Sequence, residues 1–333
     1  MPTESAPSAP AARPDWGTLA RKYLIGGIFV ALIVLFAALT GGKTLQLQNL
    51  LNIVVQVAPI GILALGMTFA IITLGIDLSV GSVVALAAVI SASLAQLPNA
   101  SPKMYPGLLL PAIVSMVVAL AVGAAAGFVN GFLVSRFRIA PFIATLGMMT
   151  AARGLTMIYS DGRPISTLDP NYNAIGQGSV LFVPLPILLF AAVAVLTHVL
   201  LNYTRFGRHT FAIGGNEQAA RVSGVNVGRV KLKIYTLIGA FAGLTALIMT
   251  ARVGSAAPDL AVGIELDAIT ATVIGGTAFS GGVGTAWGTV IGALIIGVIN
   301  NGMGLMGISP FLQQVVKGVI IVVAIIIDER KNR

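Results

Sequence analysis

The charged side chains that could bind a partner gather in one polar stretch, residues 202–233, between two long apolar runs. Only 9% of all residues in the chain are charged. The stretch holds one acid, Glu217, against six basic residues: Arg205, Arg208, Arg221, Arg229, Lys231 and Lys233. A cationic loop beside membrane spans belongs on the cytoplasmic side, because an excess of Lys and Arg near the ends of spans sets their orientation.

This polar stretch also contains the signals of a short helix. Gly214 and Gly215 break the chain, Asn216 can cap a helix, and residues 217–222 predict one or two helical turns that Gly224 ends. Such a helix, held at the membrane surface by the flanking spans, could receive a push from a soluble partner. A loop that only sets the membrane topology is equally compatible with these residues.

A carboxylate interrupts the apolar residues 53–97. The sequence Gly75-Ile-Asp-Leu-Ser-Val-Gly81 places Asp77 close to lipid depth, where a charge is costly unless it caps a helix or faces a cavity. We expect Asp77 to cap a helix that restarts after the break, with Ser79 as the alternative cap. Direct contact with a transported solute is the other interpretation, since broken helices line the binding cavities of transporters.

A second interruption, residues 275–284, repeats the Gly-x-x-x-Ser-x-Gly pattern of the first. Each interruption is followed by an Asn and then by a Pro-Phe pair, which weakly indicates two five-span halves in opposite orientations. Glycine-rich stretches can also simply permit tight helix packing. The candidate residues for a translocation pathway or a helix break are Asp77, Ser79, Asn130, Gly276, Thr277, Ser280 and Asn300.

Several kinds of chemistry have no residues to support them. The chain has no cysteine, and its two histidines, His198 and His209, are too few and too far apart to suggest a metal site. The phosphate-binding pattern Gly-x-x-x-x-Gly-Lys-Ser/Thr is incomplete at Gly42-Lys43-Thr44, where Ala37 replaces the first glycine. We therefore expect no catalytic residues, no metal and no cofactor, and any ATP would be hydrolysed by another subunit.

The composition predicts an all-α polytopic membrane protein. Of 333 residues 56% are hydrophobic and 39 are glycine, which is too much apolar surface for a water-soluble domain. The net charge of +9 sits at the ends of apolar segments, so we attribute it to topology and expect no nucleic acid partner. Ten spans are expected, at residues 23–40, 51–74, 80–97, 108–134, 142–159, 183–201, 234–250, 268–279, 286–298 and 311–327.

The charge distribution supports this topology. With residues 1–22 as a disordered cytoplasmic tail and residues 328–333 as a cytoplasmic C-terminal tail, inner segments hold 14 basic residues and outer loops hold four. Residues 23–327 then form one transmembrane domain. The outer acids Asp161, Asp259 and Glu265 could meet basic docking residues of a soluble partner, although each is equally an ordinary solvated loop residue.

Several motifs together resemble one known family, the permease subunits of bacterial ABC importers for ribose and related monosaccharides. They are Gly75-Ile-Asp-Leu-Ser-Val-Gly81, the run Pro141–Gly154 that begins Pro-Phe-Ile-Ala-Thr-Leu-Gly, Ser160-Asp-Gly-Arg-Pro-Ile165, Gly214-Gly-Asn-Glu-Gln-Ala-Ala-Arg-Val-Ser-Gly224, Glu265-Leu-Asp-Ala-Ile269 and Ile274-Gly-Gly-Thr277. The resemblance covers residues 66–333 and implies the ten-helix fold of the cobalamin-importer type, with two pseudo-repeated halves.

The resemblance also implies partners and a role for the polar stretch. They are a second permease copy, a cytoplasmic ATP-binding subunit and a periplasmic sugar-binding protein, assembled at the bacterial inner membrane with membrane lipid around the spans. In this family the segment matching residues 216–224 is the coupling helix that sits in a groove of the ATPase. The implied coupling residues are Gly215, Asn216, Glu217, Ala219, Ala220, Arg221 and Gly224.

The predicted function is therefore monosaccharide import driven by a separate ATPase. A proton- or ion-coupled sugar carrier is the alternative, but it would be favoured by several acids in mid-span, where this chain offers mainly Asp77. A passive channel would need no coupling loop. The sugar itself is left open, because in this family its choice resides largely in the outer binding protein.

Overall fold

A computed structural model describes residues 16–331, and nearly all of its regular structure is helical. The helices are α1 (Trp16–Leu39), α2 (Leu47–Ile72), α3 (Val80–Leu94), α4 (Ala112–Arg136), α5 (Pro141–Ser160), α6 (Pro170–Gln177), α7 (Leu185–Tyr203), α8 (Arg205–Gly215), α9 (Glu217–Val222), α10 (Val227–Val253), α11 (Ile264–Ile274), α12 (Ala286–Leu305) and α13 (Pro310–Lys331), with a 3-10 turn, η1 (Lys43–Leu45).

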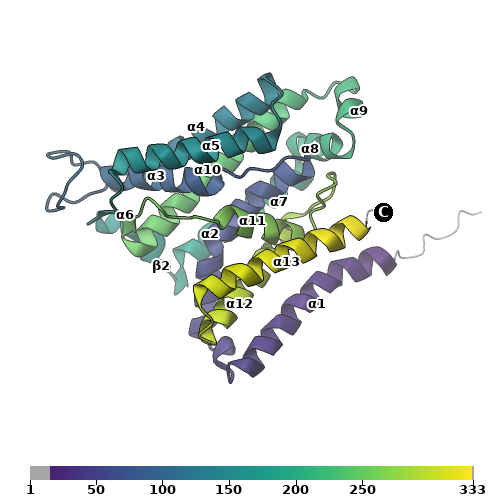
Figure 1. The fold of residues 1–333 in the computed structure, drawn as a ribbon, viewed down its shortest axis with the longest axis horizontal. Helices are drawn as coiled ribbons and strands as arrows, with labels where there is room; N and C mark the ends of the chain where they lie inside the picture. Colours follow the sequence, from purple (N-terminus) through teal and green to yellow (C-terminus); the bar gives the residue numbers. More distant parts are fainter. Residues whose placement is uncertain (1–15, 332–333) are drawn as a thin grey trace, which may run out of the picture.

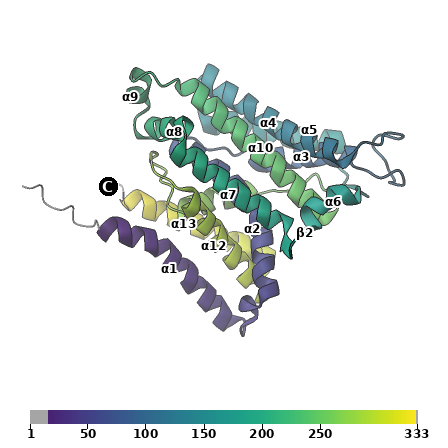
Figure 2. The same ribbon diagram turned by 180° about the vertical axis from the view of Figure 1, so that it is seen from behind.

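Two short antiparallel ladders join the loops. Strand β1 (Ile165–Ser166) pairs with β4 (Ser255–Ala256), and β2 (Ser179–Val180) pairs with β3 (Val183–Pro184). The helices form one elongated bundle (Figures 1 and 2). Helix α9, the start of α1 and the end of α13 lie at one end of it, whereas α6 and β2 lie at the opposite end.

The structure supports a polytopic membrane protein. Within residues 16–331 six helices are long and apolar enough to cross a membrane, namely α2, α4, α5, α7, α10 and α12. Shorter apolar helices are residues Ile25–Leu39 of α1 and the whole of α3. The predicted span at residues 268–279 is replaced by α11, which has 11 residues, because the chain leaves the helix at Gly275 and Gly276. Gly276 has φ +87°, a backbone conformation that ends a helix.

The terminal boundaries differ from those predicted from sequence. Helix α1 begins at Trp16 and α13 ends at Lys331, so residues 16–22 and 328–331 are helical although they were assigned to tails. Both ends continue an apolar helix, and extending a formed helix by a turn is much easier than starting one. The remaining tail residues, 1–15 and 332–333, lie outside the described residues.

The closest helix pair in the bundle is α4 with α10. Gly123 and Gly127 on α4 face Gly239 and Gly243 on α10, and a Cβ added at Gly127 would collide with the backbone carbonyl oxygen of Tyr235. Figure 2 shows the two helices side by side along most of their length. Small residues allow this approach, which in a membrane is a main source of helix association. The two helices therefore form one rigid pair.

We expect Gly127→Val to destabilise the protein by about 1–3 kcal/mol, because overpacking an interface forces the backbones apart. The matched control is Gly147→Val on α5, where no heavy atom lies within 4 Å of the added Cβ position. Thermal unfolding of the two purified variants in the same detergent measures the difference. An equal loss of stability in both variants would show that the close α4–α10 contact does not stabilise the protein.

Candidate functional site

The polar stretch folds into two short helices that are joined at a sharp corner. The Thr204 hydroxyl accepts a hydrogen bond from the Gly207 amide (3.2 Å) and caps α8. The Asn216 side chain accepts one from the Ala219 amide (2.9 Å) and caps α9, which Gly224 follows at φ +85°. The predicted helix at residues 217–222, with its Asn cap, is thereby confirmed.

Helix α8 was missed by the sequence reasoning, which read residues 202–215 as loop. Its signal was present but weak, because the helix is only 11 residues long and contains three glycines. The buried positions Gly207, Thr210, Ile213 and Gly214 recur at helical spacing, and Thr204 is a good N-cap. This helical period within the polar stretch is the sequence signal for α8.

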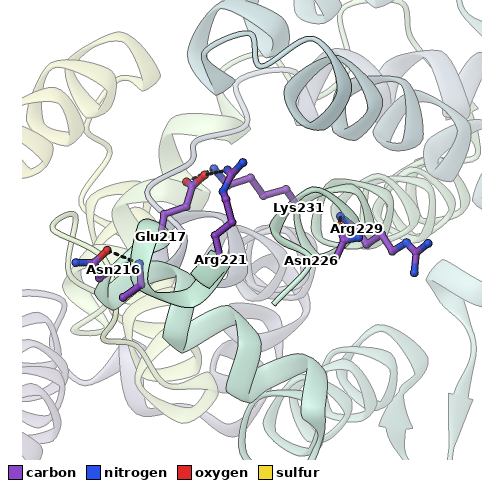
Figure 3. A network of polar contacts seen from close by, with 7 residues as sticks. Asn216, Glu217, Arg221, Asn226, Arg229 and Lys231 are labelled. Carbon is purple, nitrogen blue, oxygen red and sulfur yellow. Dashed lines mark hydrogen bonds and ion pairs between the residues drawn. The ribbon is translucent and has the colours of Figure 1, made fainter. Parts of the chain in front are cut away.

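Glu217 ties α9 to α10. Its carboxylate accepts hydrogen bonds from Arg221 on the same helix (2.8 Å) and from Lys231 on α10 (2.7 Å), as Figure 3 shows. The Lys231 side chain is only 17% exposed, against 36% for Glu217. The hydrogen bond from Lys231 is the main cause that lowers the pKa of Glu217, and Arg221 adds to it while partial burial opposes it. This carboxylate therefore links α9 directly to the first turns of α10.

The end of α8 meets two other segments through their backbones. A Cβ added at Gly214 would collide with the carbonyl oxygen of Ile72, at the end of α2, and with the amide nitrogen of Gly282. The Gly282 amide in turn donates a hydrogen bond to the Ile72 carbonyl (3.0 Å). We call Gly214, Ile72 and Gly282 the glycine junction. It joins α8 to the ends of both chain interruptions.

The first interruption, between α2 and α3, is held by polar contacts inside the protein. Asp77 is 2% exposed, and its carboxylate accepts hydrogen bonds from the backbone amide (2.8 Å) and hydroxyl (2.6 Å) of Ser79. The Asn130 amide on α4 donates to the Ser79 hydroxyl (2.9 Å). The Leu78 amide donates to the Thr145 hydroxyl on α5 (3.2 Å). Three of the predicted pathway residues, Asp77, Ser79 and Asn130, therefore lie together.

The predicted restart of the helix is confirmed, since α3 begins at Val80, but Asp77 does not cap this helix as expected. The carboxylate binds the amide two residues ahead, in an Asx turn, and so holds Ser79 instead of the first turn of α3. Ser79 occupies the N-cap position, and its side chain makes no capping hydrogen bond there.

Tyr235 on α10 touches the same interruption and was not singled out from the sequence. Its ring is buried (1% exposed), and a Cβ added at Gly75 would lie 2.6 Å from the tyrosine oxygen. Its hydroxyl has no hydrogen-bond partner among the described residues. One signal was available, since Tyr235 is a polar-tipped side chain two residues after Lys233, inside an apolar run. Helix α10 thus connects α9 with the α2–α3 break.

The remaining pathway candidates do not join that cluster. Gly276, Thr277 and Ser280 belong to the second interruption, between α11 and α12, where Thr277 is 1% exposed. Asn300 lies near the end of α12, and its neighbour Asn301 exchanges amide hydrogen bonds with Asn49 (3.0 Å each). The candidates therefore occupy two interruptions, which the glycine junction connects, and one separate helix end.

The acids expected at the outer surface differ in exposure. Asp161 is 88% exposed and makes a loose ion pair with Arg163 (3.6 Å), and Asp259 is also exposed. Glu265 is half-buried, with a carboxylate oxygen against Gly81 in the first turn of α3. Arg153 on α5 donates a hydrogen bond to the carbonyl oxygen of Pro258 (2.6 Å), in the segment that precedes α11. Glu265 therefore points into the protein, unlike the other two acids.

Comparison with known proteins places these features in a family. A family model described as the permease component of the branched-chain amino acid transport system matches residues 49–325. The ribose import permease of Bacillus subtilis (strain 168) is 45% identical over 308 residues, which is 92% of this chain and 92% of that protein. The ribose import permease of Escherichia coli (strain K12) is 42% identical over 91% of this chain and 93% of that protein.

A relative named for a different sugar is almost as similar. The galactose/methyl galactoside import permease of Escherichia coli (strain K12) is 42% identical over 316 residues, covering 92% of this chain and 94% of that protein. No solved structure matches the chain. Similarity at nearly the same level to permeases for a pentose and a hexose leaves the sugar itself undecided.

We expect Asp77→Ala to destabilise the protein by about 1–3 kcal/mol, because the buried amide and hydroxyl of Ser79 lose their acceptor. Thr150→Ala is the matched control, since Thr150 is exposed and bonds only to the Leu146 carbonyl of its own helix. Thermal unfolding in detergent measures both. If Asp77→Ala kept wild-type stability and transport, Asp77 would not hold the interruption.

The ion pairs of Glu217 should stabilise α9 in a pH-dependent way. Because its pKa is lowered below the ordinary 4.5, the stabilisation is complete above pH 4.5 and is lost as the pH falls through the lower value of the folded protein. At pH 7 we expect Glu217→Gln to reduce the hydrogen-exchange protection of the α9 amides by about 0.3–1 kcal/mol. Below the pKa of the folded protein the variant and wild type should agree.

The control for this experiment is Asp161→Asn, which removes an exposed carboxylate at the other end of the bundle. It should leave α9 protection unchanged at every pH. A difference between Glu217→Gln and wild type that persisted at acid pH would contradict the ion-pair explanation.

Proposed function

This chain belongs to the permease-component family of the branched-chain amino acid transport type, and from this we propose that it imports a monosaccharide as the membrane subunit of an ATP-driven transporter. The substrate would be a ribose-like pentose or a hexose. It would arrive on a periplasmic binding protein and leave into the cytoplasm of a bacterial cell.

The observation that carries this proposal is the connected path from α9 into the bundle. The path has two branches: the Glu217–Lys231 ion pair leads to α10, and the glycine junction leads to both interruptions. A soluble subunit that closed on ATP and pushed α9 would therefore move the parts of the bundle where the helices are broken. Broken helices are where transporters bind and release their substrates.

The coupling residues would be Gly215, Asn216, Glu217, Ala219, Ala220, Arg221 and Gly224, and all of them except Ala220 are exposed or partly exposed for contact with the ATP-binding subunit. Ala220 faces inward and is 5% exposed, so it anchors the helix to the permease. Val222, at the end of α9, is 91% exposed. An apolar side chain that extends from a charged surface is a good anchor for a groove in a partner.

Topology and assembly follow from the same proposal. Six long helices, together with α1, α3, α13 and the short α11 with the chain that follows it, would give ten spans in two five-span halves. Both termini would then lie in the cytoplasm. The end of the bundle with α6 and β2 would then face the periplasm, where Asp161 and Asp259 offer exposed carboxylates to the sugar-binding protein. A second permease copy would complete the transporter.

ATP hydrolysis belongs to the partner in this proposal, and the permease acts by changing shape. A proton-coupled carrier needs a carboxylate that is free to exchange protons during transport. Asp77 is instead fully buried and engaged with Ser79, and Asp267 is paired with Lys317 on α13 (2.8 Å). These contacts favour ATP-driven coupling through α9.

The test is Val222→Asp in proteoliposomes that contain the ATP-binding subunit and the sugar-binding protein. A charge in an apolar groove should remove one anchor, worth about 2 kcal/mol or more, and reduce ribose uptake and sugar-stimulated ATP hydrolysis by at least about tenfold. The matched control is Leu47→Asp at the start of α2, where the side chain is 74% exposed. It should retain uptake.

Two results would overturn the proposal. Normal uptake by Val222→Asp would show that α9 is not the contact. Uptake that survives vanadate but collapses with a proton uncoupler would identify an ion-coupled carrier.

A further inference from the structure

A cavity of about 270 Å³ lies beside α9, and its lining includes both residues of the Glu217–Lys231 ion pair in the proposed coupling path. It opens between the α4–α5 connection and the start of α10. Its charged lining is Arg138, Glu217, Arg221 and Lys231, and small or apolar residues such as Ser135 and Gly228 form the rest. The cavity therefore connects the α4–α5 connection with the coupling helix.

The lining carries an excess of positive charge. Three cations face one carboxylate, a net charge of 3 − 1 = +2. Glu217 already accepts hydrogen bonds from Arg221 and Lys231, so Arg138 adds a guanidinium that no described carboxylate pairs with. A guanidinium offers a fixed fork of donors that matches a phosphate group. The cavity suits an anion with several oxygen atoms.

Arg138 has an unusual backbone conformation. Its φ is +56°, in the left-handed region that side-chain-bearing residues rarely adopt. Residues held in such conformations cluster at ligand-binding and switch regions, where the surrounding structure fixes them. Neighbouring Arg136 is an ordinary residue of the last turn of α4 and does not line the cavity.

A row of aromatic side chains along α4 ends at Phe137, the residue before the cavity-lining Arg138. The rings of Phe128 and Phe132 stack at 6.4 Å, and Phe132 meets Phe137 edge-on at 5.7 Å. These rings are 49%, 43% and 62% exposed, in chain order. In a membrane-spanning helix such rings face acyl chains, and Phe137 directly precedes Arg138. An apolar row that ends at a cationic cavity has the amphipathic character of a phospholipid.

We propose that this cavity binds the headgroup phosphate of an anionic phospholipid, with the acyl chains lying along Phe128, Phe132 and Phe137. Arg138 and Arg221 supply the donors, so the lipid bridges the α4–α5 connection and the coupling helix. Basic pockets on the cytoplasmic side of membrane proteins take such headgroups. This site goes beyond the proposed transport function and takes from that proposal only the cytoplasmic position of α9.

An acidic side chain of a soluble partner would match the cationic cavity equally well. It would leave the aromatic row without an occupant, because a soluble protein does not reach along a membrane-spanning helix. The row therefore favours lipid, and the partner becomes one outcome of the test.

The experiment measures phosphatidylglycerol and phosphatidylcholine retained by the full-length protein in native mass spectrometry. Washing in about 0.5 M salt reduces the Debye length to about 4 Å and removes non-specific surface attraction. The wild-type protein should retain more phosphatidylglycerol than phosphatidylcholine. Arg138→Gln should reduce its retention about fivefold or more, Arg138→Lys should restore part of it, and Arg136→Gln should match wild type.

The outcomes separate the sources of the phosphate. Equal retention by wild type and Arg138→Gln overturns the proposal, as does displacement of the lipid by glycerol phosphate at millimolar concentration, which would mean a general anion site. Unchanged lipid retention with lost binding to the ATP-binding subunit would assign the cavity to that partner instead. If Arg138→Gln aggregates, Ser135→Glu takes its place, because it puts a negative charge into the same cavity. Ser135→Glu should lose phosphatidylglycerol to the same extent, and wild-type retention of the lipid by this variant would also overturn the proposal. None of these measurements depends on transport.

Discussion

The contact on which the rest of this structure depends is direct backbone-to-backbone packing at glycine. Lipid tails are as apolar as the helices, so burial of apolar area does not drive the spans together, and close van der Waals contact becomes decisive. On α4 and α10 the glycines let two long helices touch along their backbones. At the glycine junction the same kind of contact joins α8 to the end of α2 and to the second interruption.

These contacts hold α4, α8 and α10 closely against their neighbours, while the chain stays non-helical at the two interruptions. Helix α9 has only six residues and could not persist alone, since short isolated helices are unstable in water. It is ordered by the Asn216 cap and by the ion pair of Glu217 with Lys231. The rigid α4–α10 pair extends from there to Asn130 and Tyr235, which both touch the α2–α3 break.

Sequence reasoning was most successful where a residue type has one dominant physical role. Asn216 and Gly224 marked the ends of α9, and the glycines and Asp77 marked the first interruption, because caps and breaks are local. The family followed from motifs that stand in order along most of the chain. The inward position of Glu265 and the contact of Tyr235 with Gly75 depend on segments far apart in sequence, which no local pattern encodes. Helix α8 was hidden by its glycines, which lower helix propensity but allow the backbone contact at Gly214.

The Tyr235 hydroxyl has a consequence for the resting conformation. A buried hydroxyl without a partner raises the free energy of the arrangement that encloses it, by about 1–3 kcal/mol. Any rearrangement that offers this group water or an acceptor recovers that amount. The oxygen lies against Gly75, in the α2–α3 break, so this cost falls where the bundle is already discontinuous. Tyr235 therefore makes the contact between α10 and the break less stable than a fully hydrogen-bonded contact would be.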